Sequence, residues 1–97
     1  MLGGARAGWS YASWPFASIQ VAPGALQVHC LRTYTFTPAE VTAVEPVGWI
    51  PLLSTGIRIH HAKRDYPDYI IFYSGGQRDK LLDALRAAGF TVGEPAG

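Results

Sequence analysis

The sequence predicts a mainly β (α+β) domain: an antiparallel roll or barrel of six or seven short strands, capped by one C-terminal helix. The first observation is a series of short apolar or alternating stretches at even spacing as far as Tyr73. The second is a single amphipathic helical pattern, which begins near Gln77 and ends near Phe90. We expect an N-terminal arm at 1–13, one domain at 14–92 and a disordered tail at 93–97.

The predicted helix has an apolar stripe opposite a charged face. The apolar residues recur at helical spacing and are Leu81, Leu82, Leu85, Ala88 and Phe90. Gly89 is placed to end the helix in the left-handed conformation, with Phe90 packing back. A helix this short is marginal alone, so the strands before it must supply a surface that buries the stripe.

The clearest hairpin runs from Phe16 to Cys30, with a type II turn at Pro23-Gly24. Its inward residues alternate with polar ones and are Ala17, Ile19, Val21, Leu26, Val28 and Cys30. Tyr34 and Phe36 alternate with threonines and predict a third strand. The residues before this hairpin differ: Met1 to Gly8 is rich in glycine, and we expect it to be loose.

Three further strands are predicted after a short turn. Thr37-Pro38-Ala39-Glu40 has the pattern of a capping box with proline at the first helical position, which predicts one helical turn. Strands are expected within 41–47, at 56–60 with Ile57 and Ile59 inward, and around Ile70 to Tyr73. A charged loop, 62–68, joins the last two.

Composition excludes several classes of protein. Hydrophobic residues make up 48% and charged residues 15% of the 97 residues, which is typical of a folded globule. The net charge of +1 provides no field that would attract nucleic acid. Ala7 to Leu31 has no charged residue, but prolines and polar residues interrupt it, so we expect neither a membrane span nor a signal peptide. With one cysteine and no such segment, the expected location is the cytoplasm.

The layout of these elements resembles the small bacterial pleckstrin-homology-like (PH-like) domains of unassigned role. The resemblance covers Trp14 to Phe90 and rests on the first hairpin, the Phe36–Val41 turn, the Gly56–Ile59 strand and the last strand leading into a leucine-rich helix. It implies a PH-like roll but no lipid-headgroup function, and we predict a non-catalytic binding or assembly module with this fold. The first hairpin loop, 22–25, has none of the basic residues with which phosphoinositide-binding members hold phosphate, and Gln77 to Phe90 lacks the tryptophan usual in the final helix of eukaryotic PH domains.

Metal and nucleophile chemistry have only weak candidates. His29-Cys30 and His60-His61 are adjacent pairs on strands, so the two side chains of each pair point to opposite faces and do not hold one ion. Cys30 with His61 across strands would supply two ligands, where structural zinc takes four. Cys30 is on an apolar face, and the chain has neither a nucleophile elbow nor a phosphate-binding glycine loop. We therefore expect no enzyme, metal or cofactor.

Two uncharged aromatic segments predict an association surface. They hold all three tryptophans, a large apolar area for so small a core to cover, so either at least one is exposed in the monomer or all three pack under the barrel. The residues proposed to contact a protein partner or a second copy of the chain are Trp9, Tyr11, Trp14, Phe16, Trp49, Ile50 and Leu52. A second route is the addition of a peptide strand beside the helix, at the 56–61 strand or a neighbouring edge.

The competing hypothesis is a small-anion or phosphate-headgroup site. Its candidate residues are Arg58, His60, Lys63 and Arg64, with Arg32 nearby. Asp65 and Asp68 balance this charge, so a solvated loop explains the same pattern. Protein association is the interpretation that we favour, membrane headgroups are the alternative, and nucleic acid is not expected.

Overall fold

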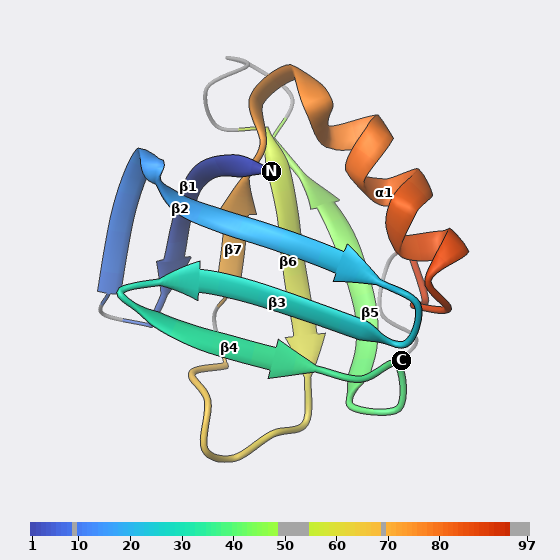
Figure 1. Cartoon of the computed structure of the whole chain (residues 1–97). Helices are drawn as coiled ribbons and strands as arrows, with labels where there is room; N and C mark the ends of the chain where they lie inside the picture. The colour runs from blue at the N-terminus through green and yellow to red at the C-terminus, as the bar shows by residue number, and fades with distance from the viewer. Residues whose placement is uncertain (9, 49–54, 69, 94–97) are drawn as a thin grey trace.

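A computed structural model of the chain describes residues 1–8, 10–48, 55–68 and 70–93, without the side chains of 13–15. In this part of the chain, seven antiparallel strands form one sheet in the order β4-β3-β2-β1-β7-β6-β5, which curls into a half-barrel followed by a C-terminal helix (Figure 1). The strands are β1 (Leu2–Ala7), β2 (Ser10–Ala22), β3 (Ala25–Cys30), β4 (Arg32–Phe36), β5 (Val41–Val47), β6 (Gly56–His61) and β7 (Ile70–Tyr73). The predicted fold class is confirmed.

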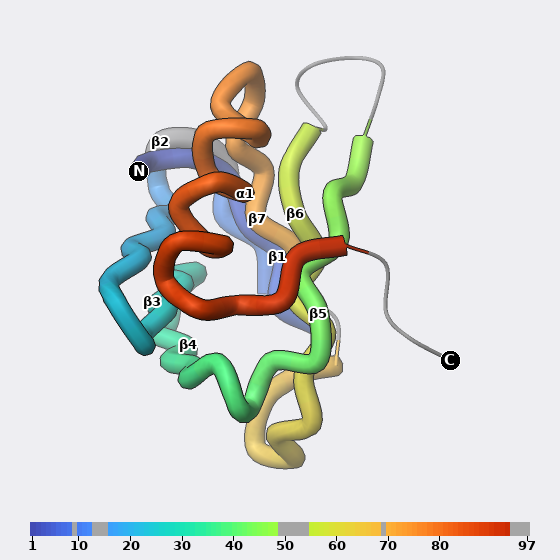
Figure 2. Tube along the Cα trace, turned by 90° about the vertical axis from the view of Figure 1, so that its right-hand side faces the viewer, coloured from blue at the N-terminus to red at the C-terminus, as the bar shows by residue number. Residues whose placement is uncertain are grey.

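The helix α1 (Arg78–Ala87) closes the roll. It follows the 3₁₀ turn η2 (Gly75–Gln77) and lies across the open side of the curled sheet (Figure 2). Leu81, Leu82 and Leu85 are buried in the same core as the inward residues of the strands. The chain then reverses through Gly89, whose φ is 98°, and the Phe90 amide donates to the Leu85 carbonyl at 3.0 Å. The predicted stripe and helix end are both confirmed.

The first hairpin also forms as predicted. β2 pairs with β3 so that Ile19 faces Val28, and Gly24 in the turn has a φ of 72°. At the end of β4, the Thr37 amide donates to Glu40 Oε1 at 2.8 Å, and the Glu40 amide donates to the Thr37 carbonyl at 3.0 Å. The 37–40 pattern thus closes one hydrogen-bonded turn between β4 and β5.

The expectation of a loose N-terminus is wrong. Residues 2–7 form β1, which pairs with β2 on one side and β7 on the other. Small residues are required here because the sheet is tightly packed: a Cβ on Gly3 would fall on the Tyr73 carbonyl oxygen and the Phe72 ring. Glycine and alanine at 3–5 therefore mark a close approach of strands and not a flexible end.

The pairing of β1 with β2 contains a large bulge, an irregularity of several residues. Gly3 is opposite Ala17 and Ala5 is opposite Ala12, so Gly4 alone on β1 corresponds to residues 13–16 on β2. Bulges of this kind bend a strand and redirect its side chains. Here the bulge falls within the uncharged aromatic segment that the sequence marks for association.

The helices of the described part are too short or too polar to span a membrane.

Candidate association surface

Three exposed apolar or aromatic side chains lie on β2 or in the connection between β3 and β4, and we call Tyr11, Phe16 and Leu31 the association rim. They are 55%, 73% and 72% exposed. Phe16 is the last residue of the bulge, two positions before Ser18, so it lies on the outer face of β2. Tyr11 faces Arg6 across the β1-β2 pair, and the Arg6 guanidinium carbon is 5.6 Å from the centre of its ring.

Leu31 completes the rim from the tight connection between β3 and β4. Its φ of 66° is unusual for a residue with a branched side chain, and the described chain has this conformation at glycines otherwise. The turn therefore holds a leucine in a strained conformation while exposing its side chain to water. A backbone outlier with an exposed apolar side chain is a signal of function, because neither feature stabilises the monomer.

Two of the seven residues predicted for association are described with their side chains, and both, Tyr11 and Phe16, are exposed. Trp14 lies within β2, but its side chain is outside the described part. Trp9 and the three residues Trp49, Ile50 and Leu52 lie outside the described residues altogether. Sequence reasoning missed Leu31, because nothing in Cys30-Leu31-Arg32 predicts a turn there.

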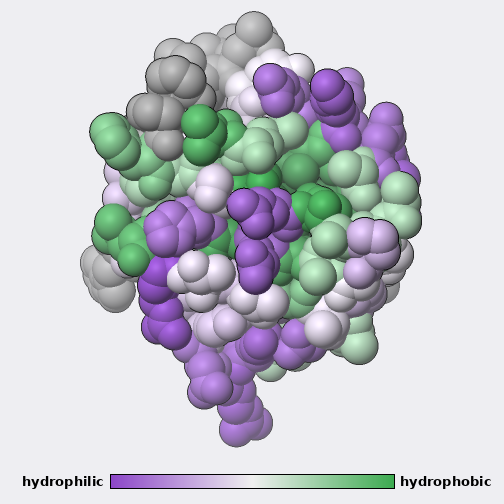
Figure 3. All heavy atoms as spheres, in the orientation of Figure 1, coloured by the Kyte–Doolittle hydropathy of each residue, from purple (hydrophilic) through white to green (hydrophobic). Residues whose placement is uncertain are grey.

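The outer face of β2, β3 and β4 extends from the rim and is polar without charge. Its residues line a shallow hollow of about 240 Å³ and are Ser18, Gln20, Gln27, His29 and Thr33. His29 Nδ1 lies 3.2 Å from the Thr33 hydroxyl. Figure 3, drawn in the orientation of Figure 1, shows hydrophilic residues over the middle of these strands, with hydrophobic ones above and beside them and neutral or hydrophilic ones below. This face is therefore polar at its centre and apolar at its ends.

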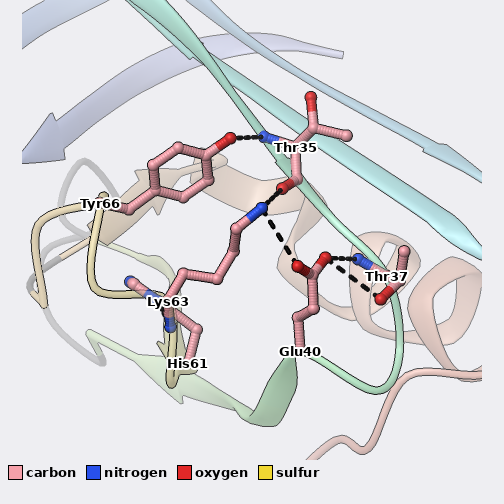
Figure 4. A network of polar contacts seen from close by, with 6 residues as sticks. All are labelled: Thr35, Thr37, Glu40, His61, Lys63 and Tyr66. Atoms are coloured by element: carbon pink, nitrogen blue, oxygen red, sulfur yellow. Dashed lines mark hydrogen bonds and ion pairs between the residues drawn. The ribbon is translucent and has the colours of Figure 1, made fainter.

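The basic residues of the alternative hypothesis are not gathered on one surface. Lys63 points toward the end of the roll, where its Nζ donates to the Thr35 carbonyl at 3.1 Å and pairs with Glu40 Oε2 at 3.2 Å (Figure 4). The same ammonium lies 4.4 Å from the centre of the Tyr66 ring. Lys63 thus closes the end of the roll by contacts within the chain.

The other basic candidates lie on a different side. Arg58 and His60 alternate with the buried Ile57 and Ile59, so they point to the outer face of β6. There His60 Nε2 is 2.9 Å from Glu45 Oε1, a carboxylate of the neighbouring strand. Arg64 is exposed in the loop. Arg58 and His60 thus lie on the outer face of β6, whereas Lys63 points to the end of the roll with Arg64 next to it in sequence, and anion binding stays a prediction.

The thiol and imidazole groups are separated in the way that strand alternation requires. Cys30 is buried, its Sγ donates to the Ala5 carbonyl at 3.4 Å, and burial raises the pKa of the thiol. His29, its neighbour, is on the exposed outer face. His61 Nε2 lies 2.8 Å from the Pro67 carbonyl oxygen, in the loop after β6. In the described part, no three histidine, cysteine or acidic side chains are grouped to hold a metal ion.

Each edge strand of the sheet is contacted at one residue of its backbone by another segment of the described chain. On β5, the Val44 amide donates to the Thr91 carbonyl and the Gly93 amide donates to the Val44 carbonyl, each at 2.8 Å. On β4, the Thr35 amide donates to the Tyr66 hydroxyl at 3.2 Å. β6, named above as a route for a peptide strand, is internal to the sheet, between β7 and β5. Edges covered in this way resist pairing with another chain.

Comparisons with protein families, with curated proteins and with solved structures find no match for this chain. A functional assignment therefore depends on the surfaces described above. Leu2 on β1 is also 59% exposed, but the association rim combines exposed apolar side chains with the unusual backbone of Leu31.

Proposed function

We propose that this protein is a non-catalytic association module with a PH-like roll, which contacts a protein partner through the association rim. The observation that carries the proposal is the bulge at 13–16, because it presents Phe16 at 73% exposure beside a sheet that is otherwise well packed. A bulge costs pairing in the sheet, and it is typical of positions where a strand redirects a side chain for function.

The rim has enough apolar area to contribute to binding but not to bind alone. Complete burial of Phe16 and Leu31 would contribute about 1.5 to 3 kcal/mol each. Association itself costs at least about 4 kcal/mol in lost freedom of movement. A partner must therefore cover neighbouring surface as well, and Tyr11 and the outer face of β2 to β4 supply it.

The PH-like assignment is part of the proposal and is supported by the layout: a curled antiparallel sheet whose open side is covered by a C-terminal helix. Headgroup binding at the first hairpin loop has no support, since Pro23-Gly24 lies between two alanines. Addition of a peptide strand has little support in the described part, because both sheet edges already contact other segments of the chain. Contacts through the side chains of the association rim are the route of binding that remains.

The proposal is tested with a photoreactive phenylalanine analogue, p-benzoylphenylalanine, in place of Phe16 in the full chain in its native host. We expect a cross-linked protein at this position, and loss of that product when excess unmodified chain competes. A Phe16→Ser competitor should fail to prevent the cross-link. The matched control carries the analogue at Arg86, on the exposed face of α1.

Equal yields at Phe16 and Arg86, or no product at Phe16, would show that the rim has no partner. Equal competition by the native and Phe16→Ser chains would show that the cross-link reports collision and not binding.

A further inference from the structure

We infer that the partner is a second copy of this chain, docked on the outer face of β2, β3 and β4 about a two-fold axis. The inference rests on the proposed function, since it names the partner of the same rim. In a two-fold interface the same patch is used by both copies, so the patch must be complementary to itself. The outer face of β2, β3 and β4 meets this condition in its charge, its hydrogen-bonding groups and its shape.

Charge is the first argument. Ala7 to Leu31 has no Asp, Glu, Lys or Arg, and its one basic side chain is the imidazole of His29, so β2 and β3 bring no carboxylate, ammonium or guanidinium group to the interface. Partners of different sequence commonly recognise each other by opposite charges across the interface, and two copies of a charged face repel. A neutral face avoids that repulsion when it meets its own copy.

Hydrogen-bonding groups at the centre of the face are the second argument. Gln20 is directly opposite Gln27 in the β2-β3 pair, and both side chains are exposed. Each carboxamide has two N–H donors and an accepting oxygen, so one amide can bond to another amide in either direction. The neighbouring hydroxyl groups of Ser18 and Thr33 also both donate and accept. Two such centres can satisfy each other without a complementary partner sequence.

Shape is the third argument. Phe16 projects from the middle of β2, just before the Ser18–Ala22 stretch that pairs with β3, and a mostly apolar hollow of about 320 Å³ lies at the C-terminal end of β2, lined by Val21, Ala22 and Ala25 together with the stems of the two glutamines. Phe16 and Ala22 are six residues apart on one face, or roughly 20 Å along the strand. A two-fold axis midway between them, near Ser18 and Gln20, places Phe16 of each copy over the hollow of the other.

The size of the face predicts a weak dimer. Stable complexes bury about 800 Å² on each partner, and three short strands with a small rim supply less than that. We therefore expect a dissociation constant in the micromolar range or above and a dimer that exchanges rapidly.

The test uses charge at the centre of the face in the full chain. Sedimentation equilibrium is measured from about 1 µM to about 1 mM, a range that spans weak association. Gln27→Lys and Gln27→Glu each place like charges near the two-fold axis, and each should weaken association at least about tenfold. An equimolar mixture of the two should associate at least about tenfold more tightly than either alone. Gln77→Lys, outside the face and before α1, is the matched control and should behave as the native chain.

A chain that is monomeric throughout this range overturns the inference. So does a dimer whose strength is the same in native, Gln27→Lys and mixed samples, because its interface then lies elsewhere. A monomeric chain with a Phe16 cross-link to a different protein would overturn the second copy as partner and leave the proposed function standing. If Gln27→Lys and Gln27→Glu weaken the dimer and their mixture restores it, but Phe16 gives no cross-link, the outer face of β2 to β4 is supported as the interface and the association rim is contradicted.

Discussion

Glu40 closes the turn between β4 and β5 and also holds the lysine that closes the end of the roll. Its carboxylate accepts from the Thr37 amide at 2.8 Å and the Thr37 hydroxyl at 3.1 Å, and it pairs with Lys63 at 3.2 Å. The hydrogen bond from the Thr37 backbone, followed by that from Lys63, lowers the pKa of this carboxyl below its ordinary value. One side chain therefore couples the turn, the loop after β6 and the edge of β4.

This coupling predicts a pH dependence that Glu40→Gln removes. A carboxyl whose pKa is lower in the folded state stabilises the fold above its unfolded value of about 4.3, and that contribution is lost as the pH falls through the folded value. We expect the native chain to be more stable than Glu40→Gln at pH 7, with the difference shrinking below pH 4. Urea unfolding at pH 7 and pH 3 measures it. A stability difference between the native chain and Glu40→Gln that is the same at pH 7 and pH 3 would contradict the lowered pKa of Glu40 as its cause.

The turn closed by Thr37 and Glu40 was predictable from the sequence because a capping box is a local pattern. Leu31 was not, because its conformation is imposed by the pairing of Cys30 with Arg32 across the shortest connection in the described sheet. Nor was the contact of Lys63 with Glu40, since it joins residues from different strands and loops. Local signals were sufficient for the turn at 37–40, but not for the turn at Leu31 or for contacts between residues that only the fold brings together.

At the scale of the elements, patterns of two and of about 3.6 residues predicted most of the structure. β3 and β6 alternate strictly, and α1 has its leucine stripe, so each was found near its observed bounds. β1 was missed because Leu2-Gly-Gly-Ala-Arg-Ala has neither β-branched nor aromatic residues. β1 lies in the middle of the sheet because its small residues fit the narrow space beside β7. This packing is tertiary, and the strand propensity of single residues does not describe it.

The same close packing makes a strong prediction at Gly56, the first residue of β6. It is opposite Tyr73, and a Cβ there would fall on the Phe72 backbone carbonyl, which cannot move without disturbing the ladder. We expect Gly56→Ala to lower the free energy of unfolding by about 1 to 3 kcal/mol. Gly76→Ala is the matched control, because a Cβ at that position meets open space. Chemical denaturation of both variants checks this, and equal stability would show that β6 can shift.

The whole molecule is a sheet with two edges that the chain covers in different ways. β4 is covered by side chains of the 62–68 loop, and β5 by the backbone of the segment after α1. Val92 forms a parallel bridge with Val44 and packs against the core, so the end of the helix is fixed to the far edge of the sheet. Because another segment already contacts each edge strand at one residue, we expect association at the outer face and the rim.

Opening the β5 edge should therefore change how the molecule associates. Gly93 has a φ of 139° and donates its amide to Val44, and proline can supply neither this conformation nor the donor. In Gly93→Pro we expect the Val44 amide, which donates to Thr91, to exchange with solvent about two- to tenfold faster, because a lost hydrogen bond is worth about 0.5 to 1.5 kcal/mol. Hydrogen exchange measured at single residues reports this directly.

An uncovered edge offers unpaired backbone groups to other chains, so light scattering of concentrated Gly93→Pro should rise over hours while the native chain stays clear. Thr91→Ser keeps the carbonyl that accepts from Val44 and is the control for changes in this segment. Unchanged exchange at Val44 in Gly93→Pro would mean that the bridge is not what protects this edge. Faster exchange without aggregation would mean that Pro46, which has no N–H, already limits pairing along β5.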